Sequence, residues 1–323
     1  MPTSTAPGKV YLFGEHAVVY GEPAVPCAVE RRAAVTVEAR DDDRVVVEAS
    51  DLTLDGFTVT FDGSTADADP ELDVPTRLVQ SATGYVEEAV AQARDAADAP
   101  DAGFELSIDS EIPLGAGLGS SAAVAVAAID AATRALGVTL PREELAERAY
   151  RTEHAVQEGG ASRADTFCSA VGGAVRVEGA DCRRLDAPEL PFVVGFDGGA
   201  GDTGELVAGV RALRERHAFA ADTVAAIGDV VRDGEEVLAD APAGSPADES
   251  TLAVLGGLMD FDHGLLSALG VSTRSLDAMV WTAREAGAHG AKLTGAGGGA
   301  VSSRSTGRTR RSGRCATRRT AST

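Results

Sequence analysis

The ten residues P-L-G-A-G-L-G-S-S-A, Pro113–Ala122, are the most informative segment of the sequence. Three glycines in five positions leave the backbone N–H groups of this loop open to close approach by a ligand. The two serines then begin an alanine-rich segment, Ala122–Leu136, that predicts a helix. Because a helix N-terminus presents unpaired N–H groups and a positive dipole, the loop is suited to bind phosphate. It is not a Walker A loop, since no G-K-[ST] follows the glycines; a plain strand-to-helix connection is the simpler alternative.

Length and composition indicate a globular protein of two lobes. The chain has 323 residues, more than a single domain usually holds. Its 44% hydrophobic and 24% charged residues are ordinary for a soluble protein. No apolar run of about 18 residues predicts a membrane span, and the first residues do not resemble a secretion signal. The four cysteines have neither metal nor disulfide spacing, so we expect a cytoplasmic protein.

The charge is strongly negative and spread along the chain, at −21. Such a field opposes nucleic acids and anionic membranes, and we expect neither as a partner. Diffuse acidity with few aromatic residues is typical of proteins soluble in concentrated salt, and we favour halophily over plain surface acidity. The only two lysines, Lys9 and Lys292, both fall in glycine-rich motifs. Where arginine is the default cation, a lysine suggests a need for a compact point charge.

Hydrophobic patterning predicts an α+β fold, with strands mostly in the first half and helices in the second. Expected strands are 10–13, 33–39, 45–48, 57–61, 104–108, 171–177 and 192–196. Expected helices are 75–97, 120–136, 141–157, 204–216, 218–239, 249–269 and 275–286. We place the N-terminal lobe at residues 1–188 and the C-terminal lobe at 189–300.

The last 23 residues, 301–323, carry seven arginines and no acid, so residues 1–300 alone hold a charge of −28. A basic tail can bind nucleic acid or acidic partners. The change is abrupt, however, and follows a glycine motif that should lead into a buried strand. Translation of a GC-rich gene in a shifted reading frame would produce such a sequence, and we favour that interpretation. In either case we expect an unstructured tail.

Three motifs carry a family resemblance. They are P-G-K-V-Y-L-F-G-E-H-A-V-V-Y-G at Pro7–Gly21, the loop at Pro113–Ala122, and K-L-T-G-A-G-G-G-A at Lys292–Ala300. In this order and spacing they resemble the GHMP small-molecule kinases over about residues 5–300, and most closely an archaeal, halophile-like member of the branch that phosphorylates mevalonate. Galactokinases carry Asp where this chain has Val18, and homoserine kinases lack the G-K-V opening. The resemblance implies a ribosomal-protein-S5-like N-terminal lobe and a ferredoxin-like C-terminal lobe.

The resemblance also implies an activity and its residues. The expected reaction is ATP-dependent phosphorylation of mevalonate in isoprenoid precursor synthesis, with Mg²⁺ as cofactor. Ser121 and Glu153 would be the metal's protein ligands, since Mg²⁺ prefers oxygen donors. Asp165 would deprotonate the attacking hydroxyl while Lys9 stabilises the alkoxide. The residues expected at the ATP phosphates are Pro113, Gly115, Ala116, Gly117, Leu118, Gly119, Ser120 and Ser121.

The expected substrate contacts are Glu15, His16 and Thr203. In the third motif Gly295, Gly297 and Gly298 would allow close backbone approach, or simply form a tight turn. Simpler alternatives also exist for individual side chains, because Ser121 could cap its helix, Glu153 could be solvated and His16 could be a core residue. Lys292 is expected to anchor its turn rather than take part in chemistry.

Two departures from the family pattern affect the expected base. One extra residue lies between Gln157 and Asp165, and Arg163 stands where relatives often carry glycine. Both bear on the geometry of the loop before Asp165.

Other functions are left open by the sequence. A G-x-G-x-x-G at 199–204 matches a dinucleotide fingerprint, but that fold needs a second strand with an acid about 20 residues on, where this chain predicts a helix. A sibling GHMP kinase acting on phosphomevalonate or pantoate is a second alternative. A catalytically impaired nucleotide-binding fold is a third. ATP and mevalonate are the expected ligands, and a homodimer is left open.

Overall fold

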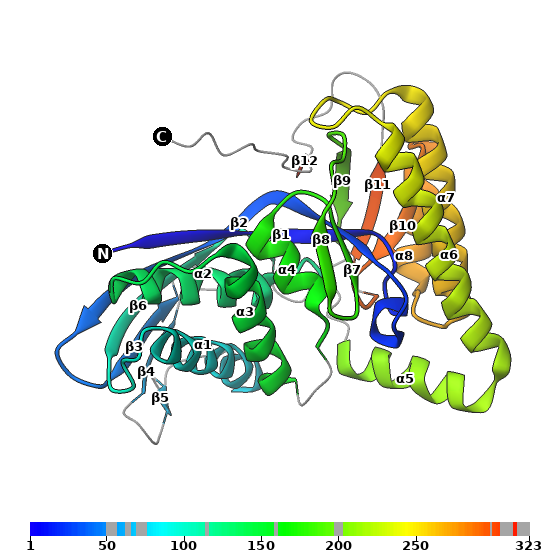
Figure 1. Cartoon of the computed structure of the whole chain (residues 1–323). Helices are drawn as coiled ribbons and strands as arrows, with labels where there is room; N and C mark the ends of the chain where they lie inside the picture. Colours follow the sequence, from blue (N-terminus) through cyan, green and yellow to red (C-terminus); the bar gives the residue numbers. More distant parts are fainter. Residues whose placement is uncertain are drawn as a thin grey trace. The chain divides into compact units, whose positions relative to one another are not determined.

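The computed structural model describes residues 1–49, 57–61, 66–68, 76–113, 116–157, 161–196, 203–297, 299–303 and 313–314 (Figure 1). Contacts divide the chain into two compact units. The first contains Met1–Gly8, Arg31–Leu114 and Gly119–Val171. The second contains Lys9–Glu30, Gly115–Leu118 and Gly172–Thr323.

A six-stranded sheet, in the order β1-β2-β6-β3-β4-β5, provides the strands of the first unit, while Lys9–Phe13 of β1 and Val25–Glu30 of β2 belong to the second unit. The strands are β1 (Thr3–Phe13), β2 (Val25–Arg40), β3 (Val45–Ala49), β4 (Phe57–Phe61), β5 (Ala66–Ala68) and β6 (Gly103–Ser110). β2 and β6 pair antiparallel and place Val35 opposite Ile108, whereas β3 runs parallel to β6. Alternate residues of β2 such as Val35 and Val37 are fully buried, as expected for a sheet with one covered face.

Four helices complete the first unit: α1 (Thr76–Ala96), α2 (Ser120–Ala135), α3 (Arg142–Val156) and α4 (Arg163–Val171). α2 contacts α1, α3, α4 and β6, and most of its residues are buried (Figure 1). Its alanines keep the helix narrow, so the neighbouring helices can approach closely. This packing fixes the N-terminus of α2, and with it the end of the glycine loop.

The second unit contains a hairpin, a four-stranded sheet and four helices. The hairpin consists of β7 (Val175–Glu178) and β8 (Asp181–Arg184). The strands of the sheet follow the order β10-β11-β9-β12. Their bounds are β9 (Pro191–Gly195), β10 (Gly290–Thr294), β11 (Gly299–Ser303) and β12 (Gly313–Arg314). The helices are α5 (Thr203–Arg216), α6 (Ala218–Asp240), α7 (Glu249–Ala268) and α8 (Arg274–Glu285). α7 and α8 both pack on β10 (Figure 1).

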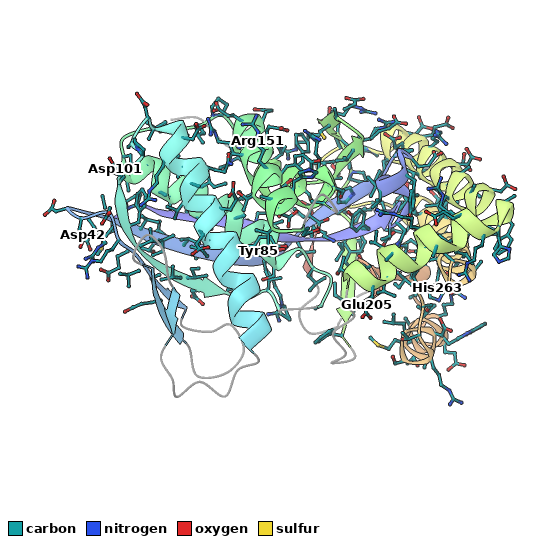
Figure 2. The ribbon with its side chains drawn as sticks, turned by 90° about the horizontal axis from the view of Figure 1, so that it is seen from below. Asp42, Tyr85, Asp101, Arg151, Glu205 and His263 are labelled. Carbon is teal, nitrogen blue, oxygen red and sulfur yellow. The ribbon has the colours of Figure 1, made fainter. Side chains whose placement is uncertain are left out.

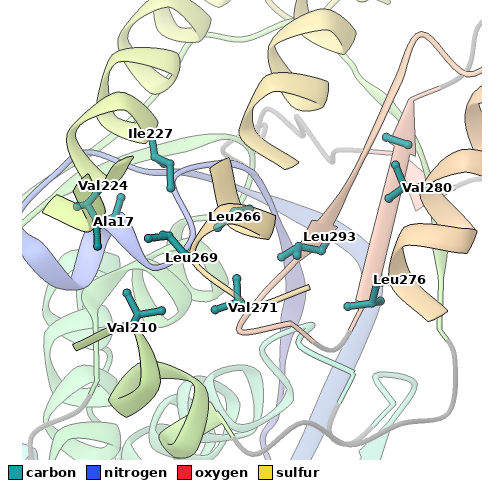
Figure 3. Close-up of a cluster of buried hydrophobic side chains, with 12 residues drawn as sticks. Ala17, Val210, Val224, Ile227, Leu266, Leu269, Val271, Leu276, Val280 and Leu293 are labelled. Atoms are coloured by element: carbon teal, nitrogen blue, oxygen red, sulfur yellow. The ribbon is translucent and has the colours of Figure 1, made fainter. Parts of the chain in front are cut away.

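The core of this unit joins the first and third sequence motifs. Ala17 begins the short 3₁₀ helix η1 (Ala17–Tyr20), and it shares a buried cluster with Leu293 of β10 (Figure 3). Ile227, Leu266 and other apolar side chains from α5 to α8 fill the rest of the cluster. Burying these side chains holds η1 and β10 in place together.

Most predicted helices are confirmed to within two residues, and so is the α+β class. The structure corrects two other expectations. The predicted strand 171–177 is wrong at its start, because Val171 ends α4 and β7 begins at Val175. The tail is not unstructured throughout: Val301–Ser303 belong to β11, which pairs antiparallel with both β9 and β10. Backbone pairing on two sides orders this segment without an apolar sequence.

The expected lobe boundary at residue 188 stays a prediction. β7 and β8 group with the second unit although they precede that boundary. Residues 304–312 and 315–323 lie outside the described part of the chain. Among the described helices, none has both the length and the apolar character needed to cross a membrane.

Two adjacent glycines of α7 provide a test of this packing. A Cβ at Gly256 would overlap the backbone carbonyl of His289 and lie 2.7 Å from Gly290 N, whereas a Cβ at Gly257 would meet nothing within 4 Å. Gly256→Ala should therefore lower the free energy of unfolding by about 1–3 kcal/mol. The matched Gly257→Ala should raise it by about 0.5–1 kcal/mol. Urea unfolding at one fixed salt concentration measures both; equal effects would contradict the close contact between α7 and β10.

Candidate active site

A hydroxyl–carboxylate pair, formed by the half-buried Ser121 and the buried Glu153, lies at the N-terminus of α2. Ser121 Oγ donates a hydrogen bond of 3.0 Å to Glu153 Oε1 on α3, and Glu153 is only 4% exposed. Ser121 is therefore not the helix cap, and Glu153 is not a solvated helix residue. The N-cap position is Gly119, with φ 70° and ψ 36°, and no side-chain cap bonds are found there among the described residues. The first N–H groups of α2 are thus left for a ligand.

Ser120 adds a further polar group at this helix end. Its hydroxyl is buried, and within the described part of the chain it makes no hydrogen bond. A buried hydroxyl without a partner is costly, so a bound group that completes its hydrogen bonding would be favourable.

Tyr85 of α1, which Figure 2 labels, and Gln157 belong to the same cluster. Gln157 Nε2 donates to Tyr85 Oη over 2.9 Å. Burial raises the pKa of Tyr85, and the negative charges of Glu153 and Asp165 raise it further, while hydrogen bonds with Gln157 and Ser121 lower it. The structure thus brings Glu153 and Asp165, two of the predicted residues, around one phenol hydroxyl.

Asp165 lies in the first turn of α4 rather than in a loop, and it is half-buried. The neighbouring Arg163 is the first residue of α4, and its side chain contacts two residues of α3. Its Nη2 lies 2.9 Å from Glu147 Oε2, and its Cζ lies 3.9 Å from the centre of the Tyr150 ring. The arginine at this position therefore ties the start of α4 to α3. Residues 158–160, where the extra residue would fall, lie outside the described part of the chain.

The donor set fits Mg²⁺. Ser121 Oγ and the Glu153 carboxylate are hard oxygen ligands, and Mg²⁺ commonly takes one or two such groups together with substrate phosphates and water. Among the described residues no group of three or more His, Cys, Asp or Glu side chains is arranged to hold a metal ion without such a partner.

In the second unit Lys9, in the second half of β1, binds the glycine loop. Its backbone N–H donates to Leu118 O over 2.9 Å, and its Nζ donates to Gly117 O over 3.1 Å. The ammonium also lies 4.2 Å from the centre of the Tyr11 ring. The N–H of Tyr11 in turn donates to Thr294 Oγ1 over 2.8 Å. Lys9 belongs to the second unit and Asp165 to the first, so their predicted pairing stays a prediction.

Two glycines from separate motifs touch one another. Gly117 and Gly295 have positive φ values of 70° and 77°. A Cβ on Gly295 would lie 2.9 Å from Gly117 Cα, and one on Gly117 would lie 3.1 Å from Thr294 O. Gly297, with φ 125°, approaches Val271 O in the same way. Only glycine fits these positions, because a side chain would be both strained and crowded.

His16 is buried in a strained turn. It has φ 59° and ψ −43°, which is unusual for a residue with a side chain, and such strain is often found at functional sites. His16 Nε2 lies 3.2 Å from Ala296 O. Because a carbonyl oxygen can only accept, Nε2 carries the proton and Nδ1 is an acceptor. Burial lowers the pKa of His16, which favours this neutral form.

His16 Nδ1 is buried and makes no hydrogen bond within the described part of the chain. It is therefore available to accept a hydrogen bond from a ligand hydroxyl. Contact of His16 with substrate stays a prediction.

Next to His16, Glu15 forms an ion pair with Lys292 in the protein interior. Lys292 also donates to Leu293 O over 2.8 Å, so the expectation that it anchors its turn agrees with the contacts. Asp262 of α7 lies 3.5 Å from the same ammonium. Burial raises the pKa of Glu15 to about 8, despite the opposing charge of Lys292.

Other predicted residues are less informative. Ala116 is buried and Pro113 half-buried, while Thr203 is exposed at the first residue of α5. Gly115 and Gly298 lie outside the described residues. Sequence reasoning missed Tyr85, Asp262 and Gln157; of these, Gln157 had a usable signal, because it follows Glu153 by four residues on the same helix face.

The dinucleotide fingerprint at 199–204 lacks its structural context. β9 pairs antiparallel with both β11 and β12, and α5 is followed by another helix, α6. The described residues around this sequence therefore do not form the parallel βαβ unit that such a site requires.

Family models match two segments of the chain. Residues 84–173 match the GHMP kinases N terminal domain, and residues 247–302 match the GHMP kinases C terminal domain. The first segment contains the Ser121–Glu153 pair and the second contains Asp262 and Lys292.

Known proteins resemble the chain over nearly its whole length. It is 42% identical to the mevalonate kinase of Pyrococcus furiosus, over 92% of this chain and 86% of that protein. The crystal structure of Methanococcus jannaschii mevalonate kinase has a TM-score of 0.72 at 24% identity, covering 94% of this chain and 90% of the other. L. major mevalonate kinase in complex with R-mevalonate has a TM-score of 0.72 at 22% identity, covering 95% and 88%. The two solved structures show a common fold.

Proposed function

Since the chain belongs to the GHMP kinase family, in which it groups with the mevalonate kinases, we propose that it transfers the γ-phosphoryl group of ATP to the primary hydroxyl of mevalonate. The product is 5-phosphomevalonate, an isoprenoid precursor. The observation that carries this proposal is the 42% identity to the mevalonate kinase of Pyrococcus furiosus over 92% of the chain. The hydroxyl and carboxylate at Ser121 and Glu153 and the imidazole of His16 support it, because they are groups of the kind that such a reaction uses.

The N-terminus of α2 is assigned to the phosphates of ATP. Its uncapped N–H groups and the Ser120 hydroxyl are suited to a phosphate oxygen, and the positive φ of Gly117 and Gly119 exposes further backbone. Ser121 and Glu153 would hold Mg²⁺, which when bound neutralises charge on the phosphates. These assignments rest on the oxygen donors and on their burial.

Asp165 is assigned as the base that accepts the proton of the attacking hydroxyl. Its place in the first turn of α4 suits a carboxylate, because the N-terminal dipole of a helix favours negative charge. Lys9 is assigned to stabilise the alkoxide as the oxygen attacks phosphorus. Gly117 O holds the Lys9 ammonium at 3.1 Å, which limits the freedom of its long side chain.

His16 is assigned to the substrate through its free Nδ1 acceptor. Mevalonate carries hydroxyl groups that can donate to a neutral imidazole. Thr203 remains a weaker candidate, since it is exposed at the start of α5. We place the enzyme in the cytoplasm of a salt-adapted cell, on the strength of its charge of −21.

A substrate panel tests the proposed reaction. ADP release with MgATP at molar KCl should depend on mevalonate, with little or no turnover of phosphomevalonate, galactose or pantoate. Turnover of one of the other substrates alone would keep the kinase chemistry and overturn the choice of substrate. Nucleotide binding without turnover of any would favour an impaired fold.

Asp165→Asn tests the base. A lost general base typically costs about 10²–10⁴-fold in rate, so kcat should fall by that order while ATP binding is kept. Asp101→Asn, at an exposed acid of the same unit, serves as the control and should leave kcat unchanged. Near-normal kcat in Asp165→Asn would remove Asp165 from the mechanism.

Two variants of His16 distinguish the effect of its hydrogen-bond acceptor, Nδ1, from the effect of its side-chain volume. His16→Ala should raise KM for mevalonate by about tenfold, the value of one hydrogen bond, with KM for ATP unchanged. Asn tolerates positive φ and places an amide oxygen near the position of Nδ1, so His16→Asn should raise KM less. Equal KM values in the two variants would argue against a hydrogen bond to substrate at this position.

A further inference from the structure

Three charged side chains meet in the interior of the second unit without any exposure to solvent. Glu15 is 1% exposed, and Asp262 and Lys292 are each 0% exposed. Lys292 Nζ donates to Glu15 Oε1 and lies 3.5 Å from Asp262 Oδ2. One ammonium therefore faces two carboxyl groups, and we refer to these three residues as the buried triad.

The charges of the buried triad do not balance if every group is ionised. Two carboxylates and one ammonium leave a net negative charge in a medium where an uncompensated charge is very unfavourable. Glu15 Oε2 also makes no hydrogen bond with the described residues. Asp262 makes none of ordinary geometry there, but the Gly14 N–H and the side chains of Glu15 and Lys292 lie close enough to it to lower its pKa against the effect of burial. One added proton would neutralise the triad and turn an unpaired acceptor into a donor. Neighbouring carboxyl groups commonly share a proton in this way.

The surrounding groups do not supply the missing positive charge. His263 of α7, which Figure 2 labels, accepts from the N–H of Leu293 through Nδ1 at 3.4 Å. Its Nε2 faces Asp277 of α8 at 3.3 Å. Both contacts suit a neutral imidazole protonated on Nε2. Burial lowers the pKa of His263 and of His16 alike.

The remaining charged neighbours pair with each other. Arg284 of α8 binds Asp260 of α7 at 2.6 Å. Among the described residues, the triad itself is therefore the place where a balancing proton would reside.

The buried triad connects to both ends of the His16 contact. Glu15 immediately precedes His16, and its carbonyl accepts a hydrogen bond from Ala17 N over 2.6 Å. Lys292 lies four residues before Ala296, the residue whose carbonyl contacts His16. The strained turn at His16 is thus fastened to the third motif through the triad.

We propose that Glu15 and Asp262 share one proton beside Lys292, and that this neutral triad holds the His16 turn in the conformation that binds substrate. The second half of the proposal rests on the assignment of His16 to mevalonate. Asp262 and Lys292 are accordingly positioning residues, which act on the substrate through Glu15 and His16.

Raising the pH should remove the shared proton. Burial raises the pKa of Glu15 from 4.5 to about 8, and it raises the pKa of Asp262 as well. A carboxyl group with a higher pKa in the folded chain binds more protons when folded, so the free energy of unfolding falls as pH rises between the two values. That window runs from 4.5 to about 8 for Glu15.

The experiment compares wild type with Asp262→Asn, which keeps the shape of the side chain and removes one ionisable group. Urea unfolding of the full chain is measured from about pH 5 to pH 9 at constant KCl, and KM for mevalonate over the same range. In wild type, unfolding should become easier as pH rises towards 8, and KM should rise by up to about tenfold per pH unit above it. Both dependences should flatten in Asp262→Asn, because Glu15 then pairs with Lys292 without a competing carboxylate.

Asp260→Asn is the matched control. It removes a carboxylate from the same helix, one that binds Arg284 and the N–H of Ala291, and lies outside the buried triad. It should lower stability at every pH while leaving the pH dependence as in wild type.

An infrared measurement covers the case in which Asp262→Asn does not fold. Wild type at pH 7 should show the carbonyl band of a protonated, buried carboxylic acid, and the band should disappear above the pKa of about 8. Absence of this band at pH 7 would overturn the shared proton.

The outcomes separate the parts of the proposal. Identical pH dependence of unfolding in wild type and Asp262→Asn would also overturn the shared proton. A flattened unfolding profile with an unchanged KM profile would overturn the positioning of His16 alone. If mevalonate is not turned over, the proposed function fails, and the unfolding and infrared data still decide the shared proton.

Discussion

The five residues of β10 are all buried, and the second unit is organised around this strand. Its start is packed so tightly on α7 that Gly290 and Gly256 leave no room for a Cβ. Its centre supplies Lys292 to the buried triad and Leu293 to the apolar core. Its end presents Thr294 to β1, and the turn beyond it presents Ala296 to His16. Displacement of this one strand would therefore disturb the core and the turn at His16 together.

Two buried glutamates, Glu153 in the first unit and Glu15 in the second, have different surroundings and therefore different proposed roles. Glu153 is buried beside a hydroxyl that donates to it, and two oxygen donors of this kind suit the Mg²⁺ that we propose for this position. Glu15 is buried beside a lysine and a second carboxyl group, which gives it a structural and proton-binding task instead. Environment, rather than residue type, separates a ligand from an anchor.

The sequence predicted the helices well, since long amphipathic or alanine-rich segments have a clear period. Helix α4 was not predicted because it spans only nine residues, from Arg163 to Val171, and mixes polar and small side chains. β11 was missed at Val301–Ser303 because its order comes from backbone partners on β9 and β10, which composition does not reveal.

Within the candidate site, motif resemblance was enough to name Ser121 and Glu153, which do meet. Asp262 could not be found in this way, because it is one of 50 acidic residues and only its burial distinguishes it. The tautomer of His16 likewise depends on a carbonyl contributed from 280 positions away. Contacts between distant segments carry no local sequence signal.

The burial of both lysines explains why these two cations were not replaced by arginine. Lys9 is 2% exposed and Lys292 is 0% exposed, in a chain whose other basic residues are arginines. An ammonium has three donors, and Lys292 directs them at Glu15, at Leu293 O and towards Asp262. A guanidinium has five donors in a flat fork and would leave some unsatisfied in this space. An acidic, arginine-rich chain therefore keeps lysine where a buried cation with few donors is required.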